Sequence, residues 1–214
     1  MEVQRGLLIV VSAPSGAGKT TICREVLNSC LGLTYSISYT TRPIRPGEVN
    51  GTDYFFVSEQ EFKRKIEAGE FLEWTKKFGY LYGTATETIQ DSLTRGADLL
   101  LDIDTEGARN LKKVLPDAVF VFILPPSLEE LRRRLENRGS ECEDSIGIRL
   151  NKAGEEIKEV FWYDYIIINE KIGEGVEQLK SIYLAEKNKR NRKISEVKKR
   201  FNLEEKINYG KNNC

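Results

Sequence analysis

Four short runs of apolar residues alternate along the chain with segments of amphipathic character. The runs are "LLIVV" (7–11), "ADLLLDID" (97–104), "DAVFVFIL" (117–124) and "YDYIIIN" (163–169). They are rich in leucine or β-branched residues, which is typical of strands that are buried on both faces of a sheet. The segment "YSISY" (35–39) suggests a fifth strand of the same sheet.

Segments with helical spacing separate these predicted strands. They cover residues 20–30, 105–114, 127–138 and 172–190. Strands that alternate with helices favour a parallel sheet covered by helices, because each crossover must return the chain to the same edge. The hydrophobic pattern therefore predicts an α/β fold with a parallel five-stranded core sheet.

Two stretches interrupt this alternation. Residues 38–88 are rich in Gly, Pro, Tyr and Thr, with short alternating segments around one helical stretch near 59–68, and we interpret them as an inserted antiparallel lobe. Residues 137–149, "NRGSECEDSIGIR", are polar and contain glycine between two predicted helices. A loop of that size is usually functional or disordered, and we interpret it as a lid.

Composition and charge exclude several classes of protein. The 214 residues are 40% hydrophobic, which is enough for a full core, and the longest apolar runs fall far short of a membrane span. There is no histidine, and the four cysteines (Cys23, Cys30, Cys142 and Cys214) lack the spacing of a local zinc site. We expect reduced thiols in a soluble, cytoplasmic protein.

The net charge is zero, but a basic excess is confined to the C-terminal tail. Residues 185–214 hold 10 of the 33 Lys and Arg residues and 4 of the 33 Asp and Glu residues. Ile194, Val197 and Phe201 follow helical spacing there, so we expect a helical extension that docks on the body or on a second subunit. RNA binding by the tail is the alternative, and we consider it the less favoured one.

The segment "SAPSGAGKTT" (12–21) directly follows the first apolar run. Small residues let backbone N–H groups crowd around an anion, and Lys19 adds a positive charge where the next helix begins. The pattern matches the P-loop GxxxxGK[ST], except that Ala13 replaces the first glycine. A glycine-rich turn with a solvated lysine is the alternative, but strand, loop, Lys and Thr occur in the required order. The segment therefore predicts a mononucleotide site.

Further motifs make the assignment more specific. The stretches "TTRPIRPGEVNGTDYFFVS", "FLEW", "YLYGT" and "LLLDIDTEGA" closely resemble the guanylate kinase family, and the similarity runs from about residue 6 to about residue 184. The resemblance implies a P-loop nucleoside monophosphate kinase fold with an inserted GMP-binding lobe and a lid. It also implies transfer of the γ-phosphoryl group of MgATP to GMP, and to dGMP, giving ADP and the nucleoside diphosphate.

The resemblance also assigns residues to the acceptor. Arg42 and Arg45 match arginines that hold the acceptor phosphate together with Tyr54 and Tyr82, in agreement with the bidentate pairing of guanidinium and phosphate. Positions that face guanine in this family are occupied by Ser38, Glu73 and Thr84. A carboxylate suits guanine because N1–H and N2–H₂ are both donors on one edge. Without the resemblance, the arginines would fit solvated charges and Glu73 the exposed face of a strand.

On the donor side, the matching P-loop positions that bind ATP are Ala13, Pro14, Ser15, Gly16, Ala17, Gly18, Lys19, Thr20 and Thr21. The resemblance implies catalytic roles at the transferring phosphates for Lys19, Arg134, Arg138 and Arg149. A solvated basic helix is the alternative for these arginines.

Two oxygen ligands are candidates for the Mg²⁺ that accompanies ATP. The Thr20 hydroxyl is expected to bind the ion directly, as the P-loop hydroxyl normally does. Asp102 and Asp104 end a buried strand, where a carboxylate is costly unless it serves a metal or a hydrogen-bond network. By the family likeness, Asp102 lies near both the metal waters and GMP.

The predicted organisation is a P-loop core (1–37, 89–136 and 150–190), a GMP-binding lobe (38–88), a lid (137–149) and a basic tail (191–214). We expect ATP and GMP as the partners, a monomer or homodimer, no membrane, and no nucleic acid beyond the possibility left by the tail. Two rival functions remain: a guanylate-kinase-like binding module without catalysis, and a kinase acting on a phosphorylated sugar.

Overall fold

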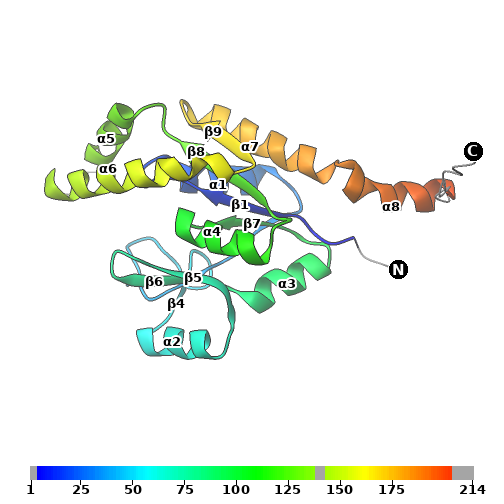
Figure 1. Cartoon of the computed structure of the whole chain (residues 1–214), viewed down its shortest axis with the longest axis horizontal. Helices are drawn as coiled ribbons and strands as arrows, with labels where there is room; N and C mark the ends of the chain where they lie inside the picture. The colour runs from blue at the N-terminus through cyan, green and yellow to red at the C-terminus, as the bar shows by residue number, and fades with distance from the viewer. Residues whose placement is uncertain (1–3, 138–142, 204–214) are drawn as a thin grey trace, which may run out of the picture.

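A parallel five-stranded sheet forms the centre of the computed structural model, which describes residues 4–137 and 143–203 (Figure 1). The strand order is β2-β7-β1-β8-β9, and all four neighbouring pairs are parallel. The strands are β1 (Leu8–Ser12), β2 (Leu33–Tyr35), β7 (Asp98–Asp102), β8 (Val119–Leu124) and β9 (Tyr165–Ile168). Four of the five match the predicted apolar runs.

Helices cover both faces of this sheet, as the alternation of side chains along β1 shows. Ile9 and Val11 pack into one core with α1 (Lys19–Ser29) and α7 (Ile172–Lys187). Leu8 and Val10 pack into a second core with α3 (Thr86–Thr94) and α4 (Thr105–Val114). Because successive residues of a strand face opposite sides, a strand between two helix layers must be apolar at every position. That requirement explains the continuous run "LLIVV".

A second sheet of four strands forms a lobe beside the core, with strand order β4-β3-β6-β5. Its elements are β3 (Tyr39–Thr40), β4 (Phe55–Phe56), α2 (Glu59–Glu67), β5 (Phe71–Lys77) and β6 (Tyr80–Ala85). The expectation of an antiparallel lobe is only partly correct, because β3 and β4 pair in parallel. The prediction of one strand over residues 35–39 is also wrong, because this segment joins two strands of different sheets. Its first residue ends β2 of the core sheet, and its last begins β3 of the lobe.

The predicted lid is more helical than expected. Helix α5 (Leu128–Glu136) is followed by α6 (Glu143–Lys158) and a short 3-10 helix, η1 (Glu159–Trp162). Leu131, Leu135, Ile146 and Ala153 form a small apolar core between α5 and α6. Helix α6 therefore begins inside the predicted lid, and the boundary placed between lid and core at residues 149 and 150 falls inside this helix.

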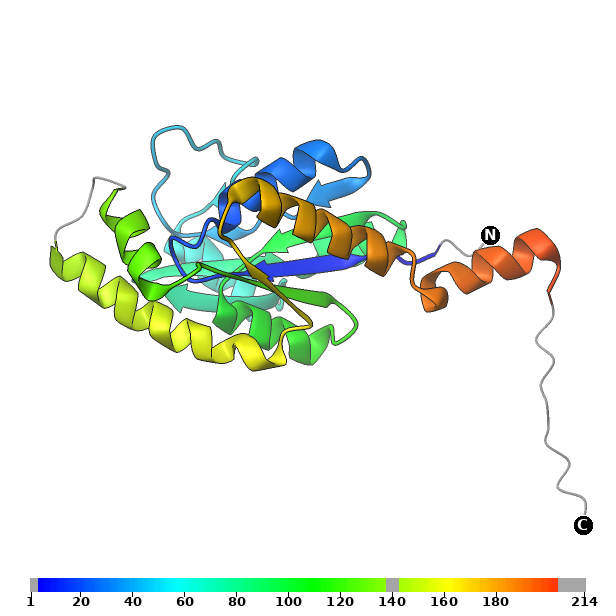
Figure 2. The same ribbon diagram turned by 90° about the horizontal axis from the view of Figure 1, so that it is seen from above.

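The C-terminal helix α8 (Arg190–Phe201) extends beyond the end of α7 and away from the sheets (Figure 2). None of its residues is buried, and Arg192 donates a 3.4 Å hydrogen bond to the carbonyl of Arg5. The predicted helical extension is confirmed over this range, but residues 204–214 of the predicted tail lie outside the described residues. No helix in the described part of the chain is long and apolar enough to cross a membrane.

Candidate active site

The loop between β1 and α1 has the backbone geometry of an anion site. Gly16 and Gly18 have φ values of 95° and 96°, in the left-handed region that favours glycine. The N–H of Ala17 donates to the carbonyl of Pro14 at 3.1 Å, which tightens the loop directly before the helix. A helix N-terminus preceded by such a loop directs N–H groups and the positive end of the helix dipole at an anion. The expected ATP-binding segment thus has the required local structure.

Asn169 supports this loop and was missed by the sequence analysis. It follows β9, is fully buried, and donates from Nδ2 to the carbonyl of Ala17 at 2.6 Å. A Cβ atom on Gly18 would lie 2.3 Å from the same Nδ2, so the amide needs glycine there. A polar residue directly after a buried parallel strand is the sequence signal that points to this position, because sites form at the carboxyl ends of such strands.

Lys19 turns back from the first turn of α1 toward the end of β7. Its Nζ lies 2.5 Å from Oδ1 of Asp102 and donates to the carbonyl of Ile103 at 2.9 Å. Burial disfavours the charged ammonium, but the Asp102 carboxylate outweighs this effect and raises the Lys19 pKa. The lysine is therefore charged and lies between the P-loop and the acidic end of the strand.

The two aspartates at the end of β7 have different environments. Asp104 is the N-cap of α4, because its Oδ1 accepts from the N–H of Gly107 at 2.8 Å. Of the two roles expected for an aspartate here, a metal ligand or a member of a hydrogen-bond network, Asp104 has the second. Asp102 has no such capping bond and faces Lys19. It is therefore the aspartate that lies toward the P-loop.

Arg42 occupies a largely buried position at the edge of the lobe. Its Nη2 donates to Oε1 of Glu48 at 2.7 Å, and its guanidinium carbon lies 5.6 Å from the ring centres of both Tyr54 and Phe56. Glu48 also accepts from the backbone N–H of Arg45 at 2.8 Å, while the Arg45 side chain is exposed. Although its partial burial acts in the other direction, the bonds to Arg42 and Arg45 lower the pKa of Glu48.

This arrangement means that Glu48 holds the arginine before any phosphate does. A carboxylate and a phosphate present similar oxygen pairs to a guanidinium fork. Tyr54 and Tyr82 lie beside Arg42, with their ring centres 6.1 Å apart. The structure therefore brings three of the four predicted phosphate ligands together. Glu48 is a further member of the site, and the motif "TTRPIRPGE" already contained it.

The predicted guanine-facing residues lie in one row across the lobe sheet. Glu73 on β5 is directly opposite Thr84 on β6, and the pairing of Tyr39 with Gly83 places Ser38, the residue before β3, beside Thr84. Residues opposite each other on neighbouring strands point to the same face. Glu73 is 6% exposed, Ser38 is 4% exposed and Thr84 is fully buried.

Hydrogen bonding within this row is incomplete. Thr84 Oγ1 donates to Oε1 of Glu73 at 2.5 Å, whereas the buried hydroxyl of Ser38 has no partner among the described residues. A buried polar atom without a partner is costly and is a common feature of a ligand site. Burial also raises the pKa of Glu73 to about 7, with the Thr84 hydroxyl acting in the opposite direction. Glu73 therefore keeps its proton to a higher pH than an ordinary glutamate before a ligand binds.

Gly107 in the first turn of α4 provides the space for this carboxylate. A Cβ atom on Gly107 would lie 2.7 Å from Oε2 of Glu73. The motif "DTEGA" places this glycine three residues after the capping Asp104, but only the packing of α4 against β5 shows why a glycine is needed there.

Two of the three predicted lid arginines lie on described helices, Arg134 on α5 and Arg149 on α6. Arg134 pairs with Glu130 at 2.8 Å and donates from Nη2 to the carbonyl of Asn169 at 3.0 Å, so it lies one residue away from the P-loop contact. Arg149 lies on α6 with its guanidinium carbon 6.0 Å from the ring centre of Phe78. Arg138 lies outside the described residues. The structure therefore brings Arg134 next to the residue that contacts the P-loop, and it places Arg149 beside the hairpin of the lobe.

The oxygen atoms near Lys19 fit a magnesium ion that arrives with a nucleotide. A threonine hydroxyl and a carboxylate are the hard ligands that Mg²⁺ prefers, and Thr20 is exposed at the start of α1. No cluster of three or more His, Cys, Asp or Glu residues suited to a metal exists among the described residues.

Comparisons with known proteins agree with this geometry. The guanylate kinase family model matches residues 5–186. Guanylate kinase of Geobacter sulfurreducens is 49% identical over 201 residues, which cover 94% of this chain and 99% of the relative, and that of Clostridioides difficile is 46% identical over 95% of this chain and the full relative. The crystal structure of guanylate kinase from Anaplasma phagocytophilum superposes with a TM-score of 0.77 at 35% identity, covering 94% of this chain and 98% of that chain. The chain belongs to the guanylate kinase family.

Proposed function

We propose that the chain transfers the γ-phosphoryl group of ATP to GMP, and to dGMP, at the junction of the P-loop and the lobe. The observation that carries the choice of acceptor is the buried row of Ser38, Thr84 and Glu73. The row offers one carboxylate and one unpartnered hydroxyl, a set that matches the two adjacent donors of guanine N1–H and N2–H₂. Adenine has no such pair of donors on that edge.

The acceptor phosphate binds Arg42 and Arg45 with the hydroxyls of Tyr54 and Tyr82. Glu48 releases Arg42 when this phosphate arrives, so a single hydrogen-bonded carboxylate contact is exchanged for a phosphate contact. No general base is required, because an oxygen of the acceptor phosphate is already anionic at neutral pH. The absence of histidine from the sequence is consistent with this reaction.

The transfer is accelerated by holding the two substrates in line and by placing positive charges around the transferring phosphoryl group. The P-loop N–H groups and Lys19 hold the donor phosphates, while Arg134, Arg138 and Arg149 neutralise charge on the equatorial oxygens as the phosphoryl group moves. Lys19 exchanges its contact with Asp102 for the phosphates. Thr20 and, through water, Asp102 would hold a Mg²⁺ ion that arrives with ATP, and the ion would offset phosphate charge.

Water competes with GMP as an acceptor, so closure must precede chemistry. We infer that residues 38–88 close on GMP and residues 137–149 close over ATP, so that the full set of cations assembles only when both substrates are present. The parallel core sheet, with the helices packed on its two faces, then acts as the frame on which both move.

A coupled assay of ADP formation with ATP and a panel of acceptors tests the proposal. We expect turnover with GMP and dGMP, and at least about 10³-fold lower kcat/KM with AMP, because the donor pair is missing. Turnover with none of the nucleotides would favour a binding module. Turnover with a phosphorylated sugar, but not with GMP, would identify the other rival function.

A further inference from the structure

The turn between β5 and β6 has an unusual residue for its backbone. Phe78 and Gly79 connect the paired residues Lys77 and Tyr80, and both have positive φ, 51° and 85°. A two-residue hairpin of this kind normally has Asn-Gly, since a bulky side chain in the left-handed region costs about 1–3 kcal/mol. An aromatic residue at this position therefore calls for an explanation outside the turn.

The Phe78 side chain contacts helix α6, which lies across from the lobe. The Nζ of Lys152 lies 4.6 Å from the centre of the Phe78 ring, and the guanidinium carbon of Arg149 lies 6.0 Å from it. A cation over an aromatic ring is attracted by the ring's negative face, and Phe78, which is 52% exposed, offers part of its ring to these cations. The turn thus places a ring where α6 presents two cations.

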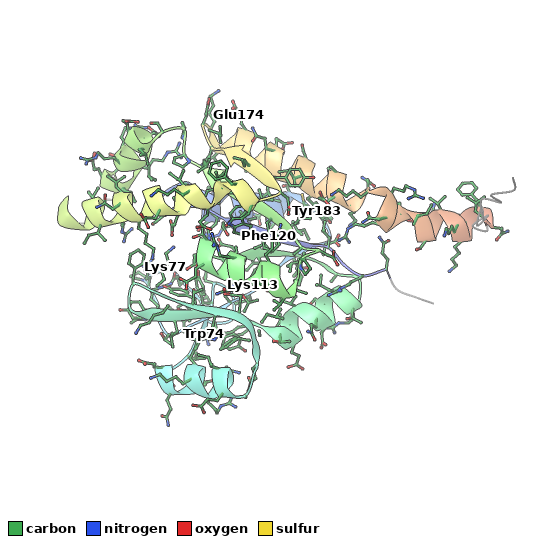
Figure 3. All side chains as sticks on the ribbon, viewed as in Figure 1. Trp74, Lys77, Lys113, Phe120, Glu174 and Tyr183 are labelled. Atoms are coloured by element: carbon green, nitrogen blue, oxygen red, sulfur yellow. The ribbon has the colours of Figure 1, made fainter. Side chains whose placement is uncertain are left out.

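An ion pair next to this ring joins the same two elements. Lys77 Nζ lies 2.8 Å from Oε1 of Glu156, with side chains only 17% and 7% exposed. A pair with so little water around it is costly to separate by moving one partner, because the other charge is left buried. Lys77 lies between the hairpin and α6 in Figure 3.

The three α6 residues in this contact share one helix face. Arg149, Lys152 and Glu156 are spaced i, i+3 and i+7, and residues at that spacing project from one side of a helix. The face that the hairpin holds is therefore the face that carries a predicted catalytic arginine. On the other side of the contact, β5 also carries Glu73, four residues before Lys77. One strand thus joins the guanine-facing carboxylate to the helix of Arg149.

We propose that Phe78 and Lys77 are positioning residues that fix Arg149 relative to the lobe, so that occupation of the acceptor site places this arginine for phosphoryl transfer. This role rests on the proposed function. It accounts for the strained phenylalanine at the turn, for the nearly buried ion pair, and for the location of both on the strand that carries Glu73. Binding of GMP and binding of ATP become linked through this contact.

Phe78→Asn is the sharpest variant, because asparagine suits the left-handed turn and the fold should be at least as stable as the wild type. We expect kcat for GMP phosphorylation to fall about 10-fold or more, with the KM for GMP changed less than about threefold, since small misplacements of a catalytic group are costly. Phe78→Tyr, which keeps the ring, should restore kcat. Phe161→Asn, at a surface residue that is 91% exposed, is the matched control and should behave as the wild type.

Calorimetry with a non-hydrolysable ATP analogue supplies a second readout. In the wild type, saturating GMP should tighten analogue binding, and Phe78→Asn should lose most of this effect. The exchanged pair Lys77→Glu with Glu156→Lys should retain more of it than Lys77→Glu alone. Unchanged kcat and unchanged linkage in a folded Phe78→Asn protein would overturn the positioning role, as would a rise in the KM for GMP alone. A wild type without GMP kinase activity would overturn the proposed function instead.

Discussion

The hydroxyl of Thr84 donates a 2.5 Å hydrogen bond to Oε1 of Glu73, between directly opposed residues of β6 and β5. The bond fixes the carboxylate in a buried row while leaving lone pairs on both of its oxygens, because an ionised carboxylate can accept about four hydrogen bonds. Oε2 faces Gly107 on α4. Thr84 and Gly107 therefore fix the position of the Glu73 carboxylate, and its remaining lone pairs can accept hydrogen bonds from a ligand.

This environment predicts a pH dependence of acceptor use. Burial raises the pKa of Glu73 to about 7, and guanine needs the ionised form as an acceptor. We therefore expect kcat/KM for GMP to fall as the pH drops through about 7, approaching tenfold per pH unit below it. Because the GMP phosphate also titrates, near about pH 6, the profile must be compared with that of Glu73→Gln, which lacks the first titration. Superimposable profiles would show that Glu73 does not control the step.

The same pKa predicts a change in stability with a defined sign. The folded state holds the Glu73 proton up to a pKa of about 7, whereas the unfolded chain releases it near the ordinary pKa of a glutamate, 4.5. Between these values the folded state binds more protons, so the contribution of Glu73 to the free energy of unfolding decreases as the pH rises. Urea unfolding of the wild type and Glu73→Gln between pH 4.5 and pH 7.5 measures it. A difference that does not change with pH would contradict the assignment.

Gly107→Ala should impair the acceptor site selectively. The new methyl group would lie 2.7 Å from Oε2 of Glu73, so the carboxylate must move. We expect kcat/KM for GMP to fall about tenfold or more, which corresponds to about 1.4 kcal/mol, with the KM for ATP unchanged. Gly154→Ala in α6 is the matched control, because a Cβ atom there meets nothing within 4 Å. Equal behaviour of the two variants would remove Gly107 from the site.

Lys19→Ala should separate chemistry from acceptor binding. Lys19 joins the P-loop to Asp102, while the guanine row lies on the lobe, so we expect kcat to fall by about 10³-fold with GMP affinity largely intact. Calorimetric titration with GMP measures the second quantity. Loss of GMP binding in a folded Lys19→Ala protein would show that Lys19 also belongs to the acceptor site, contrary to the proposal.

Removal of the chain after Arg190 should leave kcat nearly unchanged. No residue of α8 is buried, and the Arg192 bond to the Arg5 carbonyl is exposed and 3.4 Å long. Steady-state kinetics of the shortened chain, with circular dichroism as a check on folding, provide the test. A large catalytic loss would mean that the tail shapes the active site.

Much of the fold could be predicted from the sequence because the core strands are buried on both faces. A strand such as β8 is apolar at every position, "VFVFIL", because both of its faces are covered by helices. Such a continuous apolar run can be recognised in the sequence alone. The P-loop was equally accessible, since Gly16, Gly18 and Lys19 each have a local physical reason for their position.

Other features depend on contacts between segments that are distant in sequence. The first two residues of β2, Leu33 and Thr34, were missed because the strand is only three residues long and pairs with β7 about 65 positions later. The roles of Asn169 and Gly107 become visible only when β9 meets the P-loop and α4 meets β5. The start of α6 was missed because "SECEDSIGIR" is polar, and the Ile146 contact with α5 outweighs that local pattern.

The most direct test of the account is the ratio of kcat/KM for GMP between the wild type and Glu73→Gln. The substitution keeps the shape of the side chain but turns one acceptor toward guanine into a donor that faces a donor. We predict a fall that can reach about 10⁴-fold, with ATP binding retained and with Glu67→Gln, an exposed glutamate of the same lobe, unchanged. A Glu73→Gln protein that uses GMP as well as the wild type does, or a wild type that phosphorylates AMP equally well, would contradict the account.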